Sequence, residues 1–88
     1  MGKFHKISQK TAAAGETVTV NCKAVDPKST FAVYYKESSA SKWSTAQKYD
    51  ANKTVDITFD KAGSYDICVK AKSKLGFISK KSFTVTVE

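Results

Sequence analysis

Apolar and polar residues alternate one by one through most of this chain, and turn-forming residues interrupt the alternation at short intervals. In residues 54–59, for example, threonine and aspartate alternate with valine, isoleucine and phenylalanine. A period of two places each set on one face of a β-strand that is buried on one side. The segments that we expect to form strands are residues 4–9, 16–26, 30–37, 42–49, 53–59, 64–72 and 77–88.

The number and spacing of these segments predict the fold class. Seven short strands, at intervals of roughly 8–12 residues, are typical of an antiparallel sandwich of the immunoglobulin or fibronectin type III kind. A five-stranded barrel is the less favoured alternative, because it needs fewer strands. The helix-compatible residues 10–16 are interrupted by Gly15 and are too few to form a helix alone. We therefore expect one all-β domain, a seven-stranded antiparallel sandwich over residues 1–88.

The two cysteines fall on opposite faces of their predicted strands. Cys22 continues the apolar alternation of Val18 and Val20, whereas Cys68 alternates with the apolar Ile67 and Val69 and should point outward. A disulfide requires two Cβ atoms about 3.5–4.5 Å apart. We expect two free thiols, although a bulge in the strand of Cys68 would change its face and leave a Cys22–Cys68 disulfide open.

The sequence AGSY, which ends at Tyr65, is typical of a tyrosine corner. In that motif the ring packs into the sandwich and the hydroxyl bonds to backbone a few residues upstream. Ile67 would then fill the core position that a cysteine occupies in immunoglobulin domains.

The net charge of +7 comes from lysine alone, since all fifteen basic residues are lysines. Proteins that read bases or hold phosphates rely on the planar fork of arginine, so we expect no nucleic-acid partner. Attraction to an acidic cell-wall polymer is the stronger of the two hypotheses. No apolar run approaches the roughly 20 residues of a membrane span, and we expect no direct membrane insertion. The first ten residues also lack the apolar stretch of a signal peptide.

Candidate catalytic and metal-binding residues are few. His5, the one histidine, lies near the start of the chain and is interpreted as a surface residue. No cysteine or histidine pair has the spacing of a zinc site, and no aspartate-rich loop contains the glycine of a calcium site. Asp50 and Asn52 are explained more simply as turn formers. We expect no enzyme activity, no cofactor and no metal.

Three aromatic residues are candidate ligand contacts, because exposed aromatic rings can stack on sugars. They are Trp43, Tyr34 and Tyr49. For Trp43 and Tyr49 we prefer a place in the core or over its end. Tyr34 lies opposite the face of Phe31 in the alternation and should be at least partly exposed.

From Phe31 onward the chain resembles the Y_Y_Y domain, also called the three-tyrosine or triple-tyrosine domain. The matching features are Tyr35 (or Tyr34), Trp43, Tyr49, the turn that ends in Tyr65, and the sequence VKAKSKLG. The resemblance implies an immunoglobulin-like fold without catalytic residues. Similar domains follow the β-propeller of two-component regulator sensors, or occur as tandem repeats in bacterial surface proteins, including those of clostridia.

The resemblance predicts a non-catalytic structural or interaction module of a bacterial multidomain surface or sensor protein. The alternative is a carbohydrate- or cell-wall-binding module, and a third hypothesis is a signal-coupling element of a sensor kinase. The lysine-rich composition and the two cysteines depart from the family pattern and favour the tandem, extracellular kind. We therefore expect an extracellular or cell-surface location, and neighbouring domains of the same chain as partners. Under the alternative function, cell-wall polysaccharide would be a second partner. The isolated domain should be a monomer.

Overall fold

Eight strands in two facing sheets form the part of the chain that the computed structural model describes, residues 6–7 and 11–88. No helix occurs in these residues, so the all-β expectation is confirmed. The strands are β1 (Lys6–Ile7), β2 (Thr11–Ala12), β3 (Thr17–Asn21), β4 (Thr30–Glu37), β5 (Ser44–Asp50), β6 (Thr54–Thr58), β7 (Gly63–Lys72) and β8 (Ile78–Val87).

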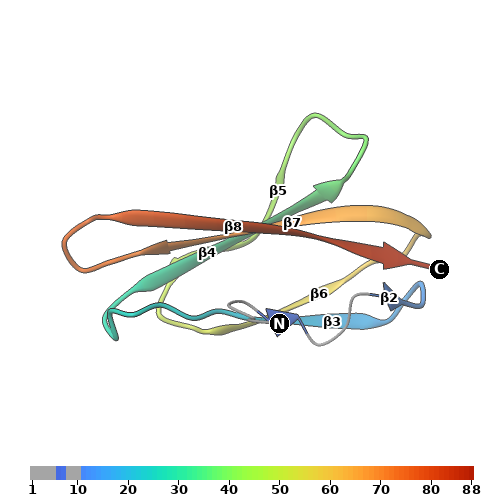
Figure 1. Cartoon of the computed structure of the whole chain (residues 1–88). Coiled ribbons are helices and arrows are strands. Elements are labelled where there is room, and N and C mark those ends of the chain that lie inside the picture. Colours follow the sequence, from blue (N-terminus) through green and yellow to red (C-terminus); the bar gives the residue numbers. More distant parts are fainter. Residues whose placement is uncertain (1–5, 8–10) are drawn as a thin grey trace.

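The smaller sheet has the order β1-β3-β6, and the larger has the order β2-β8-β7-β4-β5. Figure 1 shows them as two layers, with β3 and β6 below the long strands β7 and β8. All neighbours are antiparallel except β2, which pairs in parallel with β8. The prediction of a purely antiparallel, seven-stranded arrangement is therefore wrong, because it lacked β2. A strand of two residues carries no alternation by which it could be recognised.

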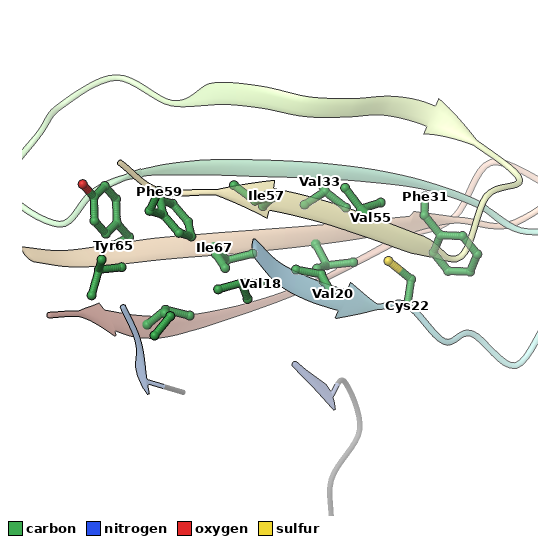
Figure 2. Packing of buried hydrophobic residues seen from close by; sticks show 14 of the residues in the cluster. Val18, Val20, Cys22, Phe31, Val33, Val55, Ile57, Phe59, Tyr65 and Ile67 are labelled. Carbon is green, nitrogen blue, oxygen red and sulfur yellow. The ribbon is translucent and has the colours of Figure 1, made fainter. Parts of the chain in front are cut away.

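The core lies between the two sheets and consists of the residues that alternation placed inward. On the β3–β6 side, Val18 and Val20 face the larger sheet together with Val55 and Ile57 (Figure 2). On the opposite side, Ile67 is fully buried near the middle of β7. The burial of these apolar side chains is the main stabilising contribution to a domain of this size. The remaining core residues are Ala12, Cys22, Phe31, Val33, Phe59, Tyr65, Val69, Ala71, Val85 and Val87.

The register of β7 decides the position of the second cysteine. β7 pairs with β4 and with β8 without a shift, so the bulge that would have turned Cys68 inward is absent. Cys22 lies in the core, Cys68 lies on the outer face of the larger sheet, and both are free thiols, as predicted. Cys68 is nevertheless only 5% exposed. The Cys68 side chain points outward but is shielded from solvent, because larger side chains on the same face lie next to it.

Tyr65 has the contacts that a tyrosine corner requires. Its ring is buried and packs on Phe59, with the ring centroids 4.2 Å apart. Its hydroxyl donates a hydrogen bond to the carbonyl oxygen of Lys61 at 2.8 Å. The bond ties the start of β7 to the turn that precedes it, and burial raises the pKa of the Tyr65 hydroxyl.

Candidate functional site

The three aromatic candidates all lie on the outer face of the larger sheet. Tyr34 is on β4, Tyr49 is on β5, and Trp43 is in the connection between these strands. None belongs to the core cluster. Of the two places preferred for Trp43 and Tyr49, in the core or over its end, the core position is wrong, and Trp43 is 44% exposed. Tyr34 is half-buried, which agrees with its predicted partial exposure.

Alternation along residues 42–49 places Trp43 and Tyr49 on the same side, and in the structure both rings lie on the outer one. The register of the β4–β5 pair shifts between Phe31 and Val33 and again between Val33 and Tyr34. Each shift inserts a residue into β5 relative to β4, and an inserted residue reverses the faces of the residues that follow it. The two insertions cancel, so Trp43 and Tyr49 keep a common side, but residues 42–49 contain no purely apolar alternating set that would mark which side faces inward.

Each of the three rings is covered by the ammonium group of a lysine. The Nζ atom lies 5.2 Å from the ring centroid for Lys36 over Trp43, and 5.4 Å for Lys70 over Tyr34. A third pair joins Lys72 to Tyr49 at 5.1 Å. These are distances of cation–π attraction, which holds a flexible lysine in one place. The outer face thus presents a row of aromatic rings with ordered positive charges above them.

A shallow hollow opens in the middle of this face, with a volume of about 330 Å³. Cys68 and Ser82 contribute to its lining, together with Tyr34 and Trp43. Among the described residues that line it, Lys70 and Lys80 carry the charged side chains. The hollow therefore combines aromatic surface with positive charge.

On the other side of Trp43 lies a second hollow, of about 270 Å³, which Asp66 and Thr84 help to line. Asp66 accepts hydrogen bonds from the hydroxyls of Ser38 at 2.8 Å and Thr84 at 3.3 Å, and its other oxygen is 3.2 Å from Lys36 Nζ. These contacts, the Ser38 bond above all, lower the pKa of Asp66. Its negative charge is therefore already balanced, and it gives Lys36 a second fixed contact.

A different surface lies at the end of the sandwich formed by the β3–β4 loop and the β7–β8 hairpin, which meet at the left of Figure 1. The carboxylate of Asp26 joins them, because one oxygen accepts from the backbone amide of Lys28 and the other from that of Lys74, each at 2.9 Å. The Lys74 bond, followed by that of Lys28, lowers the pKa of Asp26. The two loops are thus held together as one platform, which we call the loop platform (residues 23–29 and 73–79).

The loop platform exposes large apolar side chains. Leu75 is 82% exposed and Phe77 74%, and Val25 and Ile78 are also exposed. Val25, Phe77 and Ile78 line a hollow of about 640 Å³. Sequence analysis did not single out these residues. The available signal was that LGFI, residues 75–78, is apolar although it follows a predicted turn.

The described residues show no group of three or more histidine, cysteine, aspartate or glutamate side chains arranged to hold a metal ion. His5 lies outside the residues that the structure describes. Asn52 makes the hydrogen bonds of a turn former, with its side chain bonded to Gln47 and to the backbone of Thr54. Burial raises the pKa of the Cys22 thiol to about 11, so the thiolate is disfavoured.

No protein-family model matches the chain, and a search of curated proteins finds no significant relative. Within the part of the chain that the structure covers, no helix is long and apolar enough to cross a membrane.

Proposed function

We propose that this chain is a non-catalytic interaction module with an immunoglobulin-like fold, which docks a neighbouring domain of the same polypeptide on its loop platform. The parent would be a bacterial multidomain protein of the cell surface or of a sensor. The order of the strands supports the fold type: β3 and β6 correspond to strands B and E, and β8-β7-β4-β5 corresponds to G-F-C-C′. The tyrosine-corner contact of Tyr65 and the resemblance to the three-tyrosine family support it as well.

The observation that carries the docking proposal is the exposure of four large apolar side chains on the loop platform, three of which, Val25, Phe77 and Ile78, line one hollow. Scattered exposed apolar residues are ordinary on protein surfaces, but a contiguous cluster on preorganised loops is typical of an interaction site. The Asp26 hydrogen bonds fix the platform before any partner arrives, so that less conformational entropy is lost on binding.

The polarity of the chain supports a neighbouring domain as the partner. β1 pairs Lys6 with Asn21, at the end of β3 next to the residues that line the apolar hollow. β8 ends at the opposite end of the molecule, where Figure 1 marks the C-terminus. The chain therefore enters β1 from the side of the loop platform, which favours a preceding domain as the one that docks there. A second copy of the chain fits less well, because Lys23 and Lys74 would bring like charges together.

Two-dimensional amide NMR spectra of this domain, alone and joined to the domain that precedes it in its parent protein, test the proposal. We expect the amide signals of residues 24–26 and 74–78 to shift in the joined protein. The double variant Leu75→Ser/Phe77→Ser should abolish those shifts, whereas Trp43→Ser, which replaces an exposed apolar residue on another surface, should preserve them. Signals of the loop platform that are identical in both proteins would contradict the proposal. The isolated domain should be a monomer by light scattering.

A further inference from the structure

Two lysines face each other on neighbouring strands of the larger sheet. Lys70 of β7 pairs directly with Lys80 of β8, and both line the hollow beside Trp43. Side chains opposite each other in a sheet have Cβ atoms about 4.5–5.5 Å apart, and like charges in that position destabilise the pair. A chain of 88 residues can contain fifteen lysines without placing two of them directly opposite each other on neighbouring strands. Proteins accept such a local loss of stability mainly at functional sites, so the Lys70–Lys80 pair indicates a function of this face.

The positive charge of this face is not neutralised by the protein itself. Lys36 is paired with Asp66, but in the residues that the structure describes no carboxylate pairs with Lys70, Lys72 or Lys80. Lys72 follows Lys70 on the same face, about 6.6 Å further along the strand. These three lysines therefore form a short array of positive charges, which we call the lysine array.

Trp43 lies beside the lysine array, between the two hollows that it lines. Its exposed area offers an apolar surface to a ligand. The hydroxyl of Ser82, which lines both hollows, can donate to or accept from a polar ligand, and that of Thr84, which donates to Asp66, can accept. The face combines one partly exposed aromatic ring, hydroxyl groups and an array of positive charges that no carboxylate of the described residues neutralises.

We propose that this outer face binds an acidic polysaccharide, a chain of sugar rings that carry carboxylate or sulfate groups. A sugar ring would stack on Trp43, and the acidic groups would lie against Lys70, Lys72 and Lys80. Charge complementarity between the lysine array and a polyanion supports this ligand. Binding would also relieve the repulsion between Lys70 and Lys80. The proposal specifies the ligand of the alternative function that the sequence predicted, and it is independent of docking on the loop platform.

Single-stranded nucleic acid fits this face less well, although it also combines charge with rings. Proteins that bind it stack successive bases on aromatic faces. Here the faces of Tyr34 and Tyr49 are already covered by the ammonium groups of Lys70 and Lys72. Of the three rings on this face, Trp43 is the exposed one, although Lys36 approaches it as well. A polymer that needs one stacking platform and several anion contacts matches the arrangement better than a series of bases.

Binding can be measured by titration calorimetry with four polymers of known chemistry. Polygalacturonate combines sugar rings with carboxylates, dextran has rings without charge, polyglutamate has carboxylates without rings, and oligothymidylate is a single-stranded nucleic acid. We expect polygalacturonate to bind at least tenfold more tightly than each of the others. Dextran sulfate in place of polygalacturonate distinguishes sulfate from carboxylate as the preferred acidic group. Trp43 is the one tryptophan of the chain, so its fluorescence should change on binding.

Variants locate the site. Lys70→Glu/Lys80→Glu should weaken polygalacturonate binding at least tenfold, and so should Trp43→Ala. The control Lys53→Glu/Lys61→Glu makes the same change in net charge at exposed positions away from this face, and should weaken binding less than threefold. Circular dichroism should show that each variant is folded. Equal losses in both double variants, equal affinity for polyglutamate, or tighter binding of oligothymidylate would overturn the proposal. Leu75→Ser/Phe77→Ser should bind normally, which separates this site from the loop platform.

Discussion

Replacing Tyr65 by phenylalanine isolates the contribution of a single hydroxyl group to the stability of the sandwich. The ring remains in the core against Phe59, and only the 2.8 Å hydrogen bond to the carbonyl of Lys61 is lost. A hydrogen bond of this kind contributes about 0.5–1.5 kcal/mol net, and more where the partner left behind stays unsatisfied. Because Lys61 is exposed, water can reach its carbonyl, so we expect Tyr65→Phe to cost about 1 kcal/mol.

Thermal unfolding converts this cost into a shift of the melting temperature. An unfolding entropy of about 2.1 cal/mol/K per residue gives about 0.18 kcal/mol/K for the chain, so 1 kcal/mol corresponds to about 5 °C. Tyr65→Ala also removes the ring and should cost about 3–5 kcal/mol. This is a large share of the roughly 4–13 kcal/mol expected for a domain of this length.

Tyr49→Phe is the matched control. It deletes the same hydroxyl group from a half-buried tyrosine on the outer face, outside the core cluster. We expect a change within about 0.5 kcal/mol, as for other substitutions near the surface. If calorimetry and urea unfolding gave equal losses for Tyr65→Phe and Tyr49→Phe, the tyrosine-corner hydrogen bond would not stabilise this fold.

Three further outcomes follow from buried or paired groups. Both thiols should resist a thiol reagent in the native protein at neutral pH and react fully after unfolding in the absence of reductant, and a reductant requirement would show that they are joined. The pKa values of Asp26 and Asp66 are lowered from 3.8, so their stabilising contribution is present above about pH 4 and is lost as the pH falls through the folded-state values. Urea midpoints between about pH 6 and pH 2 should fall more steeply for the wild type than for Asp26→Asn. Trp43 emission should lack a strong blue shift and should be quenched by acrylamide, and emission typical of a dry core would contradict its place on the outer face.

The core of this fold could be predicted from the sequence, because a strand that is buried on one face needs apolar side chains at every second position. Val18 and Val20 in β3, and Val55 and Ile57 in β6, alternate with polar residues and are buried as expected. A strand with one apolar set leaves no choice of the face that is turned inward. For the same reason the face of Cys68 could be predicted from its neighbour Ile67.

The outer face could not be predicted in the same way. In residues 42–49 the polar Thr45 and Gln47 alternate with Trp43 and Tyr49, so no purely apolar set shows which side of the strand is turned inward. The burial of Cys68 depends on Tyr34 and Trp43, side chains from other parts of the chain that line the same hollow. The short strand β2 forms because β8 offers a free edge, which is a property of the assembled sheet.

Both candidate surfaces contain arrangements that are unfavourable in an isolated domain. The pairing of Lys70 with Lys80 puts like charges together, and the loop platform leaves Leu75 and Phe77 in water. Neither arrangement stabilises the isolated domain, and each would be relieved by a partner of the right chemistry, an acidic one in the first case and an apolar one in the second. The two surfaces lie on different parts of the molecule, one over β4, β7 and β8 and the other on the connecting loops. The two proposals together predict that the domain binds a neighbour and a polymer at the same time, and a ternary binding measurement on the joined protein tests this.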